Sequence, residues 1–461
     1  MLIQLLPPKF LKALFLFLIV CSSGFAQNIT KSDLNSIDSV MKSYYRLEEP
    51  GASIVVAKNG KVVFSKAYGM ANLEQHTPIS TASVFRMGSM TKQFTAIAIL
   101  MLVQKGQLSL EDRLNKFYPE QFKDDHGITI RHLLGHTSGI KDYITIPEVR
   151  AYATRKIKPQ EIIAIIAQSP LDFEPGSNYT YSNSGYFILG GILEQITGAS
   201  YQEFITKNIL EPLKMQHTSY EDPAQIIADR ASGYYRRAEG FINAPYIDMS
   251  VIFSAGALLT TPEDMVKWDE SLYLHSLVNA PYIKMALEPR QLNNGEYTDY
   301  GFGFRVAKVN GVNSIEHGGG IFGFQCYGIR IESAHVYVLV MTNFEGKNKY
   351  DIACAQAAAI AIGKPYSQNK YVKLSKAELA GYAGKFNGKD KLIRHTFVKN
   401  DILFYQEDKV ITQLIPMSRD TFKMDGTFDD QVTFLRENNK ITALYVKPRR
   451  QMGITMPIVK D

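Results

Sequence analysis

The spacing of apolar and polar positions changes along the chain, and the changes predict a mixed α+β protein. Two short apolar runs, residues 52–57 and 62–68, flank Asn59-Gly60, a dipeptide typical of a tight β-hairpin turn. Strand-like runs return much later, at residues 302–309, 325–331 and 336–342. Early and late strands with helices between them predict one antiparallel sheet that joins both ends of a domain, residues 28–365.

The stretch between these strands has a mostly helical pattern. Residues 94–103 are apolar on every face, which predicts a helix in the centre of the core, and Gly106 stands in the usual helix-stop position. Thr261 and Pro262 form a good helix start, with Thr261 as the N-cap. Further helical patterns cover residues 32–45, 161–167, 184–197, 201–210 and 351–362.

The pattern changes again after Pro365, where short alternating runs are separated by Asp, Asn and Gly. Such runs are typical of antiparallel strands joined by tight turns. The clearest are residues 402–405, 421–424, 431–435 and 441–446. They predict a small all-β accessory domain, a meander or a lipocalin-like barrel, over residues 376–461.

Composition narrows the class of protein. A chain of 461 residues with 45% hydrophobic content is long enough for more than one domain and for large cores. Its net charge of +6 comes from scattered basic residues, whose clusters are only pairs such as Arg236-Arg237. Because a nucleic-acid surface needs a basic patch, we expect no nucleic-acid partner.

The N-terminus predicts export. Lys9 and Lys12 precede an apolar run at residues 13–20, and small residues follow near Ala26, so residues 1–26 are interpreted as a signal peptide. The expected location is therefore the bacterial periplasm or the exterior. Cys21 offers a lipid-anchor alternative, which would be the one reason to expect membrane contact. This alternative is disfavoured because Val20 fits a lipid-attachment motif poorly.

Two cysteines, Cys326 and Cys354, remain after removal of the leader. They are expected to be two small buried hydrophobic residues rather than a disulfide, although an oxidising compartment would permit the bond.

The candidate chemistry begins at Ser89, in the sequence Ser89-Met90-Thr91-Lys92. Residues three apart on a helix have Cβ atoms about 5–6 Å apart, so the Lys92 amine can reach the Ser89 hydroxyl. The start of the apolar helix also favours developing negative charge. A serine activated by a nearby lysine is a known nucleophile for covalent catalysis.

The motif alone is weak, because Ser39-Val40-Met41-Lys42 has the same spacing. That second copy lies on an amphipathic N-terminal helix with ordinary polar neighbours, where such spacing marks a helix surface. Ser89 differs because Gly88 precedes it and a wholly apolar helix follows.

Two further motifs could complete a site. Tyr181 and Asn183 lie in a polar loop before a helix; the phenol could relay the serine proton, and the amide could hold a substrate carbonyl or the lysine. The alternative is an ordinary loop tyrosine and turn asparagine. His317-Gly318-Gly319-Gly320 suits a strand lying close against a ligand, whose N–H near Gly320 would form an oxyanion hole with that of Ser89. The alternative is a glycine-rich hairpin corner.

The order Ser-x-x-Lys, Tyr-x-Asn, His-Gly-Gly resembles the penicillin-recognising serine hydrolases, and most closely their class C β-lactamase, DD-peptidase and carboxylesterase branch. The resemblance covers roughly residues 28–363. It implies a three-layer α/β/α fold with an antiparallel sheet and a helical domain. Matching blocks are Pro50-Gly51-Ala52-Ser53, residues 85–94, residues 133–139, residues 181–186, Ser254-Ala255-Gly256 and Tyr300-Gly301-Phe302-Gly303.

The resemblance also implies roles for individual residues. Ser89 would be the nucleophile, Lys92 the general base and Tyr181 a second proton-transfer group, and the sequence leaves open which of the last two takes the first proton. For Lys92 to act as a base near neutral pH, its pKa must fall by about 3 units. Substrate binding is expected at Asn183, His317, Gly319 and Gly320.

The chain departs from β-lactamases where they carry Lys-Thr-Gly, because His317-Gly318-Gly319 stands there. A histidine is mostly neutral at pH 7, and the hydroxyl is missing. We therefore expect an esterase or a peptidase, including D-amino-acid or DD-peptide types, ahead of a β-lactamase. A non-catalytic penicillin-binding or sensor protein is the rival from another class.

No cofactor is implied, and the nine histidines show no zinc-ligand spacing, so no metal is expected. His136 is interpreted as structural, shaping its loop through hydrogen bonds to the backbone. Trp268 is interpreted as a core residue.

Overall fold

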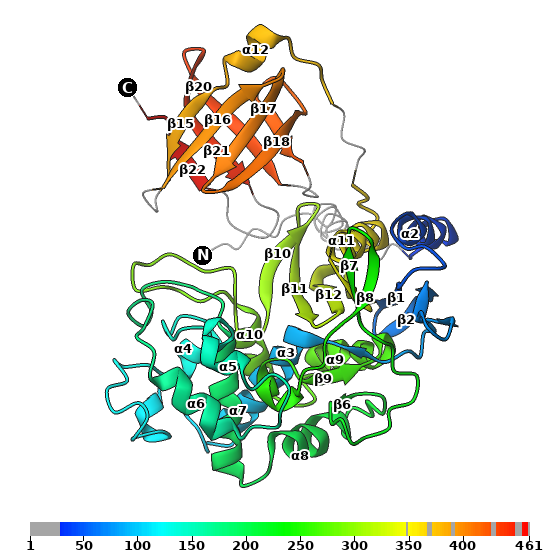
Figure 1. The fold of residues 1–461 in the computed structure, drawn as a ribbon, viewed down its shortest axis with the longest axis vertical. Coiled ribbons are helices and arrows are strands. Elements are labelled where there is room, and N and C mark those ends of the chain that lie inside the picture. Colours follow the sequence, from blue (N-terminus) through cyan, green and yellow to red (C-terminus); the bar gives the residue numbers. More distant parts are fainter. Residues whose placement is uncertain are drawn as a thin grey trace, which may run out of the picture.

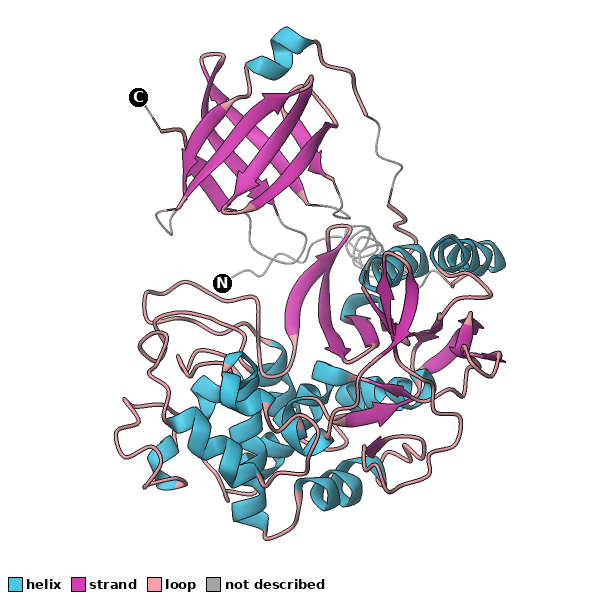
Figure 2. Ribbon diagram, viewed as in Figure 1, coloured by secondary structure: helices cyan, strands magenta, loops and turns pink. Residues whose placement is uncertain are grey.

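A six-stranded antiparallel sheet is the middle layer of the first part of the molecule (Figures 1 and 2). This computed structural model describes residues 28–346, 349–366, 371–388, 392–425, 430–447 and 454–459. The strand order is β10-β11-β12-β13-β1-β2. Their bounds are β10 Arg305–Val309, β11 Val312–Ile321, β12 Phe324–Ile331, β13 Val336–Thr342, β1 Ala52–Lys58 and β2 Lys61–Tyr68.

Strand β1 pairs with β13 along its whole length, from Ala52 opposite Thr342 to Lys58 opposite Val336. The prediction that early and late strands meet in one sheet is therefore confirmed. One strand starts later than predicted: β10 begins at Arg305 rather than at residue 302. Gly303, with φ of 82°, turns the chain just before it.

Helices cover both faces of this sheet, which gives the expected three layers. On one face, α2 (Lys31–Tyr44) and α11 (Tyr350–Ala361) share a core with alternate β1 residues such as Ile54 and Val56. The intervening Val55 points into the core on the opposite face, beneath α3 and α9. Both faces of β1 are therefore covered, and its residues from Ala52 to Ala57 are all buried, with Ser53 the one polar side chain among them.

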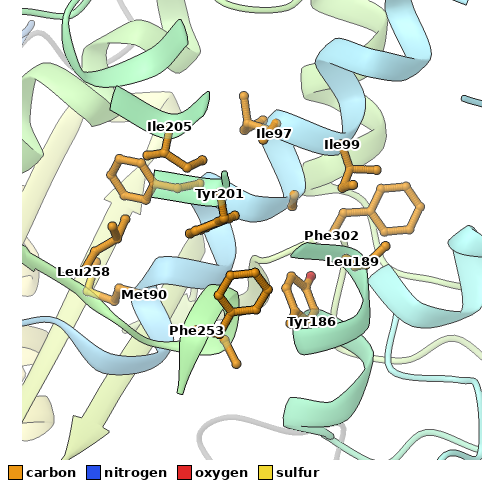
Figure 3. Close-up of a cluster of buried hydrophobic side chains, with 14 of the residues drawn as sticks. Met90, Ile97, Ile99, Tyr186, Leu189, Tyr201, Ile205, Phe253, Leu258 and Phe302 are labelled. Carbon is orange, nitrogen blue, oxygen red and sulfur yellow. The ribbon is translucent and has the colours of Figure 1, made fainter. Parts of the chain in front are cut away.

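Helix α3 (Thr91–Gln104) runs through the centre of the helical region, and every residue from Thr91 to Leu102 is buried. Figure 3 shows Ile97 and Ile99 among side chains of neighbouring segments, including Tyr201 and Phe302. The central apolar helix is thus confirmed. Surrounding helices include α4 (Ile130–Leu134), α6 (Pro159–Ala167), α7 (Asn183–Thr197), α8 (Tyr201–Ile205) and α9 (Pro262–Leu274).

Two local helix predictions can be compared with the structure. The Thr261 side chain accepts a hydrogen bond from the Asp264 N–H and so caps α9 as expected. The predicted helix 201–210 is divided, because α8 ends at Ile205 and residues 206–210 widen into a π-helical turn.

The C-terminal region forms a separate antiparallel sheet with its own aromatic core, which confirms the all-β prediction (Figure 2). Its eight strands pair in chain order, and a bridge between Phe386 and Ile458 brings the first strand beside the last, as in a barrel. The bounds are β15 Gly384–Asn387, β16 Ile393–Lys399, β17 Ile402–Glu407, β18 Val410–Pro416, β19 Thr421–Met424, β20 Gln431–Glu437, β21 Lys440–Lys447 and β22 Ile454–Pro457.

Both described cysteines are buried free thiols. The thiol of Cys326 donates to the Met87 carbonyl oxygen at 3.2 Å, and that of Cys354 to the Tyr327 carbonyl oxygen at 3.1 Å. The favoured interpretation of two small buried residues is confirmed. The predicted signal peptide, with Cys21, lies outside the described residues. Within the described ranges, no helix is long and apolar enough to cross a bilayer.

Candidate active site

Ser89 lies at the entrance to α3, on a single 3-10 turn, η1 (Gly88–Met90). Gly88, with φ of 50°, makes the tight entry. One helical turn on, the Lys92 Nζ lies 3.1 Å from the Ser89 Oγ. The predicted contact between hydroxyl and amine is therefore present.

Lys92 is completely buried, and its amine faces polar atoms from three parts of the chain. Besides Ser89, its Nζ donates to the Asn183 Oδ1 at 2.7 Å and to the Ala255 carbonyl oxygen at 2.8 Å. Burial lowers the pKa of Lys92 to about 7, although the nearby Asp142 carboxylate acts in the opposite direction. This is close to the fall of about 3 units that a general base requires near neutral pH.

Tyr181 and Asn183 stand where the loop enters α7. The Tyr181 ring centroid is 4.9 Å from the Lys92 Nζ. Burial raises the pKa of the Tyr181 phenol well above its ordinary value, while the Ser89 hydroxyl acts in the opposite direction. Its hydroxyl is buried and has no hydrogen-bond partner among the described residues. The phenol is therefore a protonated group beside Ser89 and Lys92.

The glycines after His317 lie on β11, against the chain's own backbone at the serine turn. A Cβ on Gly319 would lie 1.9 Å from the Met87 carbonyl oxygen, so this position excludes any side chain. A Cβ on Gly88 would lie 2.9 Å from the Gly320 N, which shows how closely the two backbones approach. The glycines do allow a close approach, but at Gly319 the neighbour is the protein's own backbone rather than a ligand, so substrate binding at Gly319 and Gly320 stays a prediction.

His317 is buried, and both of its ring nitrogens are engaged. Its Nδ1 lies 2.7 Å from the Gly318 carbonyl oxygen, which can only accept, so Nδ1 carries the proton. Its Nε2, 2.7 Å from the Tyr300 hydroxyl, must then accept. Burial lowers the pKa of His317 to about 3, so the ring is neutral. In this arrangement His317 offers no free donor to a substrate, and a direct binding role stays a prediction.

A cavity of about 440 Å³ opens over this cluster. Ser89, Asn183 and Gly320 line it, whereas Lys92 and Tyr181 lie behind its wall. Two charged side chains, Arg150 and Glu345, also line the cavity. The rest of the lining is largely apolar and includes Ile144, Val149, Ile247, Val251, Ile252 and Phe322.

Several partners of the site were not assigned a role from the sequence. They are Asp142, the Ala255 carbonyl oxygen, Tyr300 and Arg305, which forms an ion pair with Asp299 and lies 5.8 Å from the Tyr300 ring centroid. Ala255 and Tyr300 belong to blocks that resemble the family, and that resemblance was the available signal. Asp142 and Arg305 carried no comparable signal.

The remaining expectations concern His136 and metals. His136 is buried, and its Nδ1 accepts the Ser182 N–H at 3.2 Å, which agrees with a role in shaping the loop. Its ring centroid is nevertheless only 4.3 Å from that of Tyr181. Across the described part of the chain, no group of three or more acidic, histidine or cysteine side chains could hold a metal ion.

Known proteins match this chain over most of its length. The Beta-lactamase family model matches residues 37–362. "Penicillin-binding protein 4*" of Bacillus subtilis is 28% identical over 393 residues, which cover 80% of this chain and 87% of the relative.

Solved structures match as well. The octameric penicillin-binding protein homologue of Pyrococcus abyssi is 25% identical, with a TM-score of 0.65 over 92% of this chain and 99% of that chain. The D-amino acid amidase of Ochrobactrum anthropi, solved with D-phenylalanine, is 20% identical, with a TM-score of 0.62 over 72% of this chain and 99% of that chain. At this identity, the second likeness shows the fold alone.

Proposed function

The chain belongs to the Beta-lactamase family and is a serine hydrolase, and from that premise we propose that Ser89 is its nucleophile in an acyl-enzyme reaction on esters or amides. The observation that supports this most directly is the 3.1 Å contact between the Ser89 Oγ and the Lys92 Nζ. Lys92, with its pKa near 7, is present as a neutral amine in a large fraction of molecules at neutral pH.

The proposed reaction has two stages. In the first, the Ser89 hydroxyl gives its proton to Lys92, directly or through Tyr181, and the oxygen attacks the substrate carbonyl carbon. Collapse of the tetrahedral intermediate breaks the bond to the alcohol or amine, which leaves with a proton returned from the same groups. In the second stage, water attacks the acyl-Ser89 ester and releases the acid.

The developing oxyanion needs two N–H donors. The N–H groups of Ser89 and Gly320 are proposed for this role because the two backbones approach closely and both residues line the cavity. Asn183, which also lines the cavity, is proposed to position the substrate.

The cavity suggests the kind of substrate. Its apolar lining suits a hydrophobic group next to the scissile carbonyl, and the Glu345 carboxylate suits a substrate with an ammonium group. Amino-acid amides and esters combine both features, and the likeness in fold to a D-amino acid amidase is compatible with them. We therefore place D-amino-acid or DD-peptide substrates and simple esters ahead of β-lactams. His317 is neutral and fully engaged, so the position at which β-lactamases carry a lysine supplies no cation here, which supports this order; Arg150 is a cation elsewhere in the cavity lining.

Export is also proposed, from the N-terminal sequence pattern alone. Residues 1–26 carry a basic start, an apolar run and small residues, which together suit a secretory leader. The periplasm or the exterior would then be the site of action. Secretion of a full-length fusion that depends on residues 1–26 would test this.

Hydrolysis of a short-chain p-nitrophenyl ester by residues 27–461, beside the Ser89→Ala variant, tests the proposed activity. The same pair should be compared on D-phenylalanine amide, L-phenylalanine amide, N-acetyl-D-phenylalanine amide and a chromogenic cephalosporin. Turnover that disappears in Ser89→Ala supports the hydrolase, and preference for the free-amine D-amide supports the role of Glu345. A stable adduct without turnover would instead favour a binding or sensor protein.

A further inference from the structure

A carboxylate that the sequence did not single out stands behind the Asn183 side chain. Asp142 immediately precedes the turn η3 (Tyr143–Thr145), and Asn183 begins α7. The Asp142 Oδ1 accepts the Asn183 backbone N–H at 3.1 Å, and the Oδ2 accepts the side-chain amide Nδ2 at 3.0 Å. One carboxylate thus holds both the backbone N–H and the side-chain amide group of Asn183.

This pairing determines which way the Asn183 amide faces. A carboxylate can only accept hydrogen bonds, so the Nδ2 group must point to Asp142 and the Oδ1 must point to Lys92. The Oδ1 lies 2.7 Å from the Lys92 Nζ. On another side of the amine is the Ala255 carbonyl oxygen, at 2.8 Å, which is also only an acceptor.

The orientation of the amide decides where the lysine lone pair points. A neutral lysine amine has two N–H groups and one lone pair. The two oxygens of Asn183 and Ala255 accept the two N–H groups, so the lone pair is left facing the Ser89 hydroxyl at 3.1 Å. With the amide reversed, an N–H of Asn183 would face Lys92 and compete with Ser89 for that lone pair.

We propose that Asp142 is a positioning residue for proton transfer: it fixes the Asn183 amide so that the Lys92 lone pair stays aimed at the Ser89 hydroxyl. The inference rests on the proposed function, because it concerns activation of the same serine. Asp142 touches neither Ser89 nor the substrate in this scheme and acts through Asn183.

Asp142 also acts through its charge. Burial lowers the pKa of Lys92, and the Asp142 anion partly opposes that fall. Burial lowers the pKa values of His317 and His136, so both rings are uncharged near pH 7. Burial raises the pKa values of Tyr181 and Tyr186, so both phenols are also uncharged. The titratable side chains around Lys92 are His136, Asp142, Tyr181, Tyr186 and His317.

The test is the rate at which a fluorophosphonate labels Ser89, measured against pH. This probe forms an Oγ–P bond and releases fluoride, so its rate reports activation of the hydroxyl without any need for the natural substrate. In Asp142→Asn we expect the high-pH plateau to fall about 10- to 100-fold, because the amide loses its fixed orientation. We also expect the acidic limb to move to lower pH, because removal of the anion lowers the pKa of Lys92.

Asp125→Asn is the matched control. Asp125 is a buried carboxylate, whereas Asp142 is half-buried; Asp125 accepts the backbone N–H groups of Asn115 and Gly127, each at 3.0 Å, and forms an ion pair with Arg113. The labelling rate of Asp125→Asn should have the same high-pH plateau and the same acidic limb as that of the wild type. General loosening in Asp142→Asn would lower the plateau whether or not the Asn183 amide is present, and that result would overturn the proposal.

Two further variants sharpen the test. In an Asn183→Ala background, Asp142→Asn should lower the plateau little further, because the amide through which it acts is gone; an undiminished fall would overturn the proposal. If Asp142→Asn does not fold, Asp142→Glu replaces it. The retained charge should keep the limb in place while the longer side chain lowers the plateau, and an unchanged plateau would overturn the proposal.

Failure of the proposed function gives a different result. If the wild-type protein is not labelled at Ser89 at any pH, the hydrolase proposal fails and the role of Asp142 fails with it. If the wild type is labelled and a folded Asp142→Asn variant shows the same plateau and limb, only the role of Asp142 is refuted.

Discussion

The chain contains the Ser-x-x-Lys spacing twice, in two regions with opposite surroundings. On α2, the Ser39 hydroxyl donates to the Asn35 carbonyl oxygen at 2.9 Å, within its own helix. Lys42, whose side chain is 62% exposed, pairs with Asp38 at 2.8 Å. At the start of α3, Lys92 is 0% exposed and lies 3.1 Å from Ser89. Identical spacing thus gives a helix surface in one place and a candidate nucleophile in the other.

The difference teaches that burial, not spacing, supplies the chemistry. Desolvation disfavours an ammonium ion, and this lowers the pKa of Lys92 to about 7. The Asn183 Oδ1 and the Ala255 carbonyl oxygen accept the two N–H groups of the neutral amine, so its lone pair faces Ser89. Lys42 has no such enclosure and is paired with a carboxylate one turn away.

The largest effect is expected from comparing removal of the serine hydroxyl in the two Ser-x-x-Lys motifs. Ser89→Ala should reduce ester hydrolysis by about 10⁴-fold or more, because the covalent step is lost. Ser39→Ala should leave the rate unchanged. Steady-state rates of the two variants, with circular dichroism as a control for folding, make the comparison. Equal losses in both would mean that neither serine has a special role.

The next largest effect is on the free energy of unfolding. Replacing Lys92 should change it by an amount that depends on pH, whereas replacing Lys42 should not. The pKa of Lys92 is near 7 when folded and about 10.4 when unfolded, so the unfolded chain binds the extra proton between these values and wild-type stability rises with pH across that window. Below pH 7 the burial penalty is complete, roughly 4 kcal/mol. The stability of Lys92→Met relative to wild type should therefore fall by roughly that amount from pH 6 to pH 10.

Urea unfolding at pH 6, 8 and 10 measures this difference. Lys42→Met is the control, and its difference from wild type should stay nearly constant, since that side chain is largely exposed. A difference between Lys92→Met and wild type that does not change with pH would show that Lys92 is charged throughout.

A smaller effect is expected in the pH profile of the wild-type enzyme. In the proposed mechanism the neutral amine is the active form, so kcat/KM should rise about tenfold per pH unit below the pKa of Lys92 and level off above about 7. Initial rates at low substrate between pH 5 and pH 9 test this. A flat profile would exclude Lys92 as the group that takes the serine proton.

The smallest effect is expected at Asp38, which precedes the exposed Ser39-x-x-Lys42 motif on α2. Burial would raise the pKa of Asp38, but hydrogen bonds from Lys42, Lys66 and Tyr68 lower it below the ordinary value. Asp38→Asn should therefore cost about 1 kcal/mol at pH 7. This cost should shrink as pH falls below the ordinary carboxyl pKa and vanish only below the lowered pKa of folded Asp38, where the carboxyl is uncharged in both the folded and the unfolded chain. Thermal unfolding at pH 7 and pH 3 measures the change, and esterase activity should be unaffected.

Local patterns predicted much of the fold. Asn59-Gly60 marked the first hairpin, and the apolar run at residues 94–103 marked the central helix. Strand β11 was only suggested by its glycines, because His317 and three glycines lack strand propensity; the serine turn packed beside them explains their presence. Strands β15, β16, β18 and β22 were not identified. Polar outward-facing positions weaken the pattern in the short β15, whereas in β16 the buried positions include Arg394 and Thr396, and in β18 the apolar Val410 and Ile411 are exposed.

The site was predictable as far as its side-chain motifs extended. Ser89, Lys92, Tyr181 and Asn183 come together as the spacing and the family resemblance implied. The Ala255 carbonyl oxygen was not assigned a role, because a backbone acceptor has no residue code. Asp142 was missed because its partner lies 41 residues away, and only the folded loop brings the two together.

The most direct test of the central claim is to map the residue that a fluorophosphonate phosphonylates. The full mature protein is treated with the fluorophosphonate at pH 8, digested, and analysed by peptide mass spectrometry. We predict a single adduct on Ser89 and none on Ser39. Labelling of both serines, or of neither, would contradict the claim that burial of Lys92 turns one of two motifs with the same spacing into a nucleophilic site.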